Sequence, residues 1–123
     1  METLDYDRLM RANLSKVFGE QDAARRHDAI VELYAEDAVF YEPDSVATGH
    51  AEIAAAVADL LNSLPPFFVF SANGPAVGHH GVGRLRWSSG PAGGPAVATG
   101  TDVAHCEGGK IRSLHVFLDP PGA

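Results

Sequence analysis

The segment AVATGTDVAHCEGGKIRSLHVFL (residues 96–118) decides the fold of this chain, because it holds two strand-like runs joined by a pair of glycines. Strands favour the β-branched and aromatic residues that these runs contain. Glycine supplies the positive φ angles that a tight hairpin needs. We therefore predict a hairpin of two antiparallel strands, over residues 96–106 and 110–118.

The length of the hairpin loop sets the register of the two strands. If the loop is Gly108-Gly109 alone, Asp102 lies directly across from His115. If the loop has three residues, Glu107 to Gly109, the register slips by one and Asp102 faces Leu114 and Val116 instead. Alternation along the strands leaves both registers open.

Upstream of this hairpin, the first half of the chain is rich in helix formers and the second half in glycine, proline and β-branched residues. Apolar residues at three-to-four spacing predict helices over residues 6–18, 23–34 and 51–64. Short apolar runs bounded by turn residues predict further strands over 38–42, 67–72 and 77–88, with a loop over 44–49. This order predicts an α+β fold, with three helices packed on one face of an antiparallel sheet.

The composition excludes several classes of protein. The 123 residues suffice for a single domain, which we place over 1–123. A formal net charge of -7 disfavours nucleic acid as a partner, and no run is apolar enough to span a membrane. The acidic N-terminal residues do not resemble a secretory signal, so we expect a cytoplasmic protein. Cys106 has no disulfide partner, and His79-His80 should diverge on a strand, so we expect no bound metal.

Two carboxylates stand out as candidates for chemistry. Asp102 lies in a strand interior, where aspartate is rare because burying its charge is costly. If it points into an apolar cavity, its pKa should rise and it could act as a base or, when protonated, as a hydrogen-bond donor. The alternative is an outward, solvated Asp102 or one at a subunit contact. Glu42 ends a strand beside Pro43 and shares a face with Phe40, or it is a solvated acid at a loop edge.

The remaining candidates lie on the predicted sheet. Trp87 alternates with two arginines, which favours a place in the core or a pocket wall. The aliphatic set Leu114, Val116 and Leu118 should face the helices, which leaves His115 and Phe117 on the outer face as a dimer contact. His50 begins a helix near the end of the first strand. Nucleophile elbows, P-loops and dinucleotide motifs are missing from the sequence.

Several stretches together resemble the nuclear transport factor 2-like superfamily, and its SnoaL-like and ketosteroid-isomerase-like branch most of all. They are AIVELYAEDAVFYEP (29–43), GHAEI (49–53), GTD (100–102), GKI (109–111) and FLD (117–119). The resemblance implies a cone in which a curved, mostly antiparallel sheet wraps around three helices and leaves an apolar pocket. It also implies a homodimer formed through the outer sheet face. It favours the three-residue loop and therefore argues against an Asp102–His115 pair.

The resemblance also suggests roles for individual residues. Glu42 matches the general base of ketosteroid isomerase, and Asp102 matches its protonated oxyanion-hole aspartate. The oxyanion-hole tyrosine falls near Phe18, which has no hydroxyl, so such an enzyme should be slow unless Tyr34, Tyr41 or His50 replaces it. Val116 stands where SnoaL-type cyclases and limonene epoxide hydrolase carry an acid. The last two activities would therefore need non-standard residues.

The sequence thus predicts a small pocket protein that moves a proton on a hydrophobic carbonyl compound without a cofactor. Glu42 and Asp102 are the expected catalytic pair. The expected pocket residues are Phe18, Tyr34, Phe40, His50, Trp87, Leu114, Val116 and Leu118. The alternative is a non-catalytic module of the same fold that binds a small apolar ligand or a second subunit.

Overall fold

The computed structural model describes residues 4–120. Along the chain, the three helices precede most of the strands. The first helix, α1 (Tyr6–Ala12), continues into a π-helical turn, η1 (Asn13–Phe18). The other two helices are α2 (Ala23–Leu33) and α3 (Gly49–Ser63). Asp5 and Asp22 cap α1 and α2, since the side chain of each accepts a hydrogen bond from a backbone N–H of the first turn.

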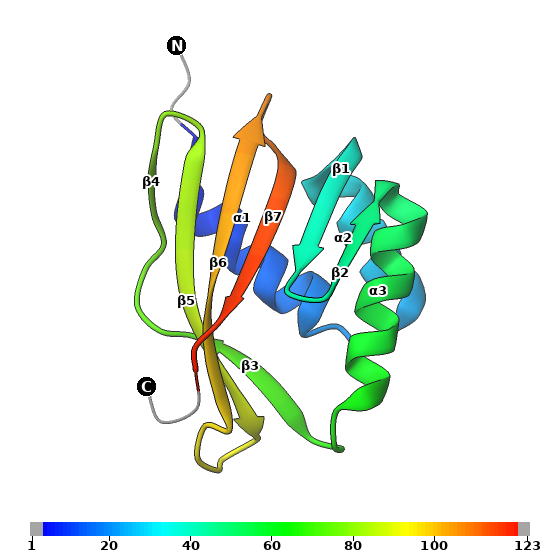
Figure 1. Ribbon diagram of the computed structural model, residues 1–123, viewed down its shortest axis with the longest axis vertical. Coiled ribbons are helices and arrows are strands. Elements are labelled where there is room, and N and C mark those ends of the chain that lie inside the picture. Colours follow the sequence, from blue (N-terminus) through cyan, green and yellow to red (C-terminus); the bar gives the residue numbers. More distant parts are fainter. Residues whose placement is uncertain (1–3, 121–123) are drawn as a thin grey trace.

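The strands form one curved, open sheet, with the helices on one side of it (Figure 1). Its strands are β1 (Tyr34–Glu42), β2 (Ser45–Thr48), β3 (Phe68–Ala72), β4 (Val77–His79), β5 (Val82–Pro91), β6 (Ala98–Glu107) and β7 (Lys110–Leu118). The strand order is β2-β1-β7-β6-β5-β3, and β4 also pairs with β5. Only the β1–β7 pair is parallel among the described strands. The predicted α+β fold is therefore confirmed.

Three predicted elements differ from the structure by more than two residues or in kind. The predicted strand over 38–42 begins at Tyr34, because the helix before it ends at Leu33. The predicted loop over 44–49 contains β2, which pairs antiparallel with β1 after a turn at Pro43-Asp44. The predicted strand over 77–88 is a hairpin, since residues 80 and 81 both adopt positive φ angles, +51° and +85°. At this turn the two histidines converge instead of diverging, and their Nδ1 atoms lie 2.9 Å apart.

The hairpin between β6 and β7 combines a two-residue loop with a bulge. Gly108 and Gly109 have φ angles of +62° and +80°, and Glu107 pairs with Lys110. The three-residue loop is therefore wrong. The register then shifts by one near Arg112, so that Asp102 pairs with Val116. Asp102 therefore does not pair with His115, and the resemblance was right on this point. The cause, however, is the bulge and not a three-residue loop.

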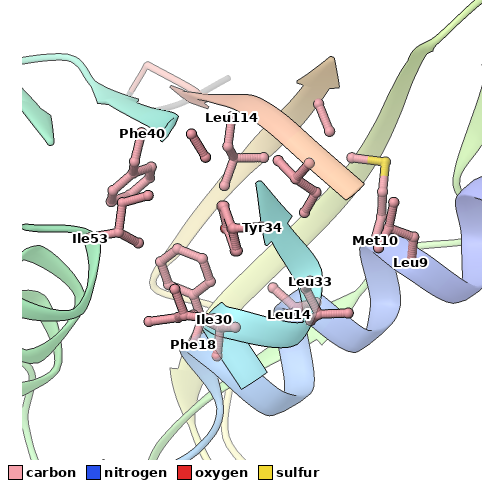
Figure 2. Close-up of a cluster of buried hydrophobic side chains, with 14 of the residues drawn as sticks. Leu9, Met10, Leu14, Phe18, Ile30, Leu33, Tyr34, Phe40, Ile53 and Leu114 are labelled. Carbon is pink, nitrogen blue, oxygen red and sulfur yellow. The ribbon is translucent and has the colours of Figure 1, made fainter. Parts of the chain in front are cut away.

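The hydrophobic core fills the space between the helices and the concave face of the sheet (Figure 2). Phe18 of η1 and Ile53 of α3 approach Phe40 of β1, while Leu114 contributes from β7. On β7 the predicted alternation holds for Leu114, which is fully buried, and for His115 and Phe117, which are exposed on the outer face. It is weaker at the end of the strand, where Leu118, expected to face the helices, is 56% exposed. The inward side chains of the central strands therefore meet the helices.

Candidate functional site

A cavity of about 90 Å³ opens between the helices and the inner face of the sheet. Its walls come from η1, α3 and five strands, so they join segments far apart in the sequence. The lining residues are Leu14, Phe18, Phe40, Glu42, Pro43, Leu60, Phe70, Trp87, Asp102, Val116 and Leu118. The lining is apolar except for two carboxyl groups and one indole N–H. Few polar groups in an apolar concavity are typical of a small-molecule site.

Aromatic rings pack edge-to-face along one wall of this cavity. The ring of Phe18 lies 5.7 Å from that of Phe40 and 6.1 Å from that of Phe70. Phe70 in turn lies 5.9 Å from Trp87. Such edge-to-face pairs fix the orientation of each ring. The wall is therefore a preformed apolar surface that ends at the Trp87 indole.

Asp102 is the buried acid of the cavity, with only 3% of its surface exposed. The indole Nε1 of Trp87 donates a hydrogen bond to Asp102 Oδ1 at 2.9 Å. Burial raises the pKa of Asp102 to about 7, and the Trp87 hydrogen bond opposes this rise because it stabilises the ionised form. Both protonation states of Asp102 are thus populated near neutral pH.

Gly100 allows Trp87 to reach Asp102. Trp87 on β5 pairs with Gly100 on β6, and a Cβ atom on Gly100 would lie 2.5 Å from Cζ2 of the indole. Because Gly100 has no side chain, the indole lies flat against the strand and its N–H reaches Asp102, two residues along β6. A glycine inside a strand often marks such a close approach.

Glu42 lies at the mouth of the cavity and is the last residue of β1, just before Pro43. It is half-buried, and Ser45 Oγ donates a hydrogen bond to its Oε1 at 3.2 Å. Glu42 also lines an open outer groove of about 480 Å³, together with Glu52 and Asp59. The structure therefore places both predicted carboxylates on one cavity, Asp102 inside it and Glu42 at its entrance.

The predicted pocket residues divide into two groups. Phe18, Phe40, Trp87, Val116 and Leu118 line the cavity, whereas Tyr34, His50 and Leu114 are not among its lining residues. Leu114 is instead fully buried in the core.

Tyr34, which is buried, and His50, which is half-buried, belong to a separate polar group. The Tyr34 hydroxyl donates to Asn13 Oδ1 at 2.6 Å, and His50 Nε2 lies 2.9 Å from the Tyr34 carbonyl oxygen. Burial, and then the nearby charge of Asp102, raise the pKa of the Tyr34 phenol well above its usual value. The Tyr34 hydroxyl therefore stays protonated and donates its hydrogen bond to Asn13.

Sequence reasoning missed Leu14, Leu60 and Phe70 as pocket residues and Asn13 as a polar partner. The first two belong to apolar helix stripes, which predict burial without distinguishing core from cavity wall. Within residues 4–120, no cluster of three or more His, Cys, Asp or Glu side chains is arranged to hold a metal ion. The described helices include none with the length and apolar character needed to cross a membrane.

An open, curved sheet wrapped around three helices, with a cavity between them, defines the nuclear transport factor 2-like class of folds. Residues 14–114 match the SnoaL-like domain, and the chain therefore belongs to the SnoaL-like domain family. No curated protein matches the sequence.

Solved structures agree with this assignment. A protein from Agrobacterium tumefaciens, provisionally named an isomerase of the SnoaL-like family, is 26% identical with a TM-score of 0.87, over 94% of this chain and 98% of that chain. A provisionally named polyketide cyclase from Sinorhizobium meliloti has a TM-score of 0.69 at 16% identity, over 89% and 93%. A provisionally named ketosteroid isomerase from Kribbella flavida has a TM-score of 0.69 at 14% identity, over 97% and 84%. The last two likenesses concern the fold alone.

Proposed function

We propose that this protein is a cofactor-independent isomerase that moves a proton on a small, hydrophobic carbonyl compound. The observation that carries this proposal is Asp102, a buried carboxyl group in an apolar cavity whose pKa is raised to about 7. A carboxyl group that stays protonated near neutral pH can donate a hydrogen bond to a carbonyl oxygen. The name of the Agrobacterium tumefaciens relative, provisionally an isomerase, agrees with this chemistry.

In the proposed reaction, the substrate carbonyl oxygen accepts a hydrogen bond from protonated Asp102. Glu42 removes a proton from the carbon next to the carbonyl group, and the electron pair of that C–H bond moves towards the oxygen to form an enolate. Asp102 stabilises the negative charge that develops there. Glu42 then returns the same proton to another carbon of the enolate, so that the substrate is isomerised without any net gain or loss of atoms.

Replacing Glu42 by glutamine tests this mechanism, because an amide cannot accept the proton. We expect the rate of proton exchange on a small β,γ-unsaturated ketone to fall on the order of 10²-fold. The measurement is NMR detection of solvent deuterium entering the ketone, together with its conversion to the conjugated isomer. Glu36→Gln is the matched control, since Glu36 is an exposed residue of the same strand. Equal rates for Glu42→Gln and the wild type would exclude Glu42 as the base.

A second candidate function is small-ligand binding without turnover. It is favoured by the cavity's lack of a second donor, because Phe18 has no hydroxyl and the Tyr34 hydroxyl is bound to Asn13. Among the lining residues, the Trp87 indole N–H is already donated to Asp102, and Glu42 must be ionised to act as the base, so protonated Asp102 is the one side-chain donor left for a substrate oxygen. Saturable ligand binding with no proton exchange on any carbonyl compound tested would favour this alternative.

We also propose that the protein forms a homodimer through the outer sheet face. Tyr41 stacks on His115 with ring centroids 4.4 Å apart, and His115 stacks on Phe117, which is 55% exposed. An exposed aromatic row at the centre of a sheet is typical of a self-complementary contact. We expect Phe117→Glu to convert a dimer into a monomer in light scattering coupled to gel filtration. Thr101→Ser, on the neighbouring strand, should leave the mass unchanged, and a monomeric wild type would refute the proposal.

A further inference from the structure

The charge balance of the cavity distinguishes the kinds of ligand that it can hold. Its lining contains the carboxyl groups of Asp102 and Glu42 but no lysine, arginine or histidine. Four of its side chains are aromatic, and the faces of aromatic rings attract cations. An anionic ligand would meet no positive partner there, and burying an unpaired charge is costly. The lining therefore favours a cation or a neutral molecule.

The outer groove extends this preference to the route into the cavity. The groove and the cavity share Glu42 and Leu60, so they meet at the cavity mouth. The groove adds the carboxylates of Glu52 and Asp59, and no basic side chain lines it. Together with a formal net charge of -7, this creates a negative potential that attracts cations to the entrance.

We propose that the cavity binds a small methylated ammonium ion, with its charge against the Asp102 carboxylate and its methyl groups against the rings of Phe18, Phe70 and Trp87. Methylated ammonium ions suit this site because they are weakly hydrated and present an apolar surface to the rings. Trp87 Nε1 donates its hydrogen bond to Oδ1 of Asp102, so Oδ2 remains for the contact with the cation. The inference requires only the cavity and Asp102, so it holds whether or not the site is catalytic.

Binding of this cation depends on the protonation of Asp102. Glu42 on β1 lines the same cavity as Asp102, the Tyr34 phenol lies close enough to respond to the Asp102 charge, and the Trp87 indole donates to Asp102 from β5. The pKa of Asp102 is raised to about 7, so the carboxylate that pairs with the cation is lost as the pH falls below that value. If one proton competes with the cation, affinity falls about tenfold for each pH unit below the pKa of Asp102.

The test compares choline with dimethylbutanol, its neutral carbon isostere of the same shape. Choline is a quaternary ammonium ion that does not titrate, so any pH dependence reports the protein. Calorimetry and NMR shifts of the Trp87 indole N–H would measure both affinities at about pH 8 and about pH 6. We expect choline to bind about tenfold more tightly than the isostere at the higher pH and to lose that advantage at the lower pH.

Asp102→Asn keeps the size of the side chain and removes its charge. It should abolish the preference for choline while leaving the isostere's affinity within about threefold. Equal affinity of the two ligands for the wild type, a choline affinity independent of pH, or no shift of the Trp87 signal with choline would overturn the proposal. None of these readouts measures turnover, so a failure of the proton-transfer mechanism would leave this result interpretable.

Discussion

Replacing Asp102 by asparagine is expected to make the protein more stable at about pH 8 by on the order of 4 kcal/mol. The folded protein raises the pKa of this carboxyl group from 3.8 to about 7, chiefly because burial disfavours the charged form. The folded state therefore binds the proton more tightly than the unfolded state. The stability due to this group is complete below the unfolded pKa and is lost as the pH rises through about 7. Asparagine has no charge to bury, and its amide oxygen can still accept the Trp87 hydrogen bond.

Urea unfolding of the wild type and of Asp102→Asn at about pH 4 and about pH 8 measures this difference. We expect similar stabilities at the lower pH and a clear gain for the variant at the higher one. Asp44→Asn serves as the control, because Asp44 is exposed in the β1–β2 turn. A variant that is destabilised equally at both pH values would show that the Asp102 carboxyl group is not strained by burial.

The same substitution separates the role of Asp102 in catalysis from its role in stability. The proposed donor is the protonated form, so the rate of the wild type should fall as the pH rises through about 7. An asparagine side chain donates through its amide at every pH. The pH–rate profile of Asp102→Asn should therefore be flat in this range. A greater stability combined with a flat pH profile would show that the Asp102 carboxyl group both lowers the stability of the folded protein at high pH and sets the pH dependence of the rate.

The sequence predicted the inward, cavity-facing place of Asp102 only through the family resemblance. Strand alternation alone left its register open, because alternation assumes an uninterrupted ladder, and the bulge near Arg112 breaks that assumption. The two-residue loop and the inward orientation of Leu114 opposite Ala104 occur together only because of that bulge. No local signal in the sequence marks it.

Other features depend on contacts between distant segments. The strand β2 has only four residues and lies at the sheet edge. It forms because it pairs with β1, rather than because of the propensity of its own residues. The Tyr34–Asn13 hydrogen bond joins the start of β1 to the π-helical turn, 21 residues earlier in the chain. By contrast, Gly100 in a strand interior was a visible sign of close approach, and its relation to Trp87 could have been inferred from strand pairing.

Replacing Phe18 by tyrosine is expected to increase the isomerisation rate by about 10²- to 10³-fold, if the added hydroxyl supplies the missing second donor to the enolate oxygen. Removing one such donor from an oxyanion site costs about this much in other enzymes. Phe18 lies on the π-helical turn and faces the cavity, with its ring held between those of Phe40 and Phe70. Because Phe18 lines the cavity, we expect the new hydroxyl to enter the cavity space without displacing core side chains.

The decisive comparison is kcat/KM for the wild type, Phe18→Tyr and Phe70→Tyr with the ketone used to test Glu42. Phe70 lines the same cavity, so its tyrosine variant adds the same hydroxyl at a different position. A general gain in polarity would accelerate both variants, whereas an oxyanion donor would accelerate only Phe18→Tyr. Because the hydroxyl acts on charge that develops in the transition state, kcat should rise while KM changes little. A folded Phe18→Tyr variant that binds the ketone but reacts no faster would contradict an oxyanion site centred on Asp102, and would favour a cavity built to bind a ligand.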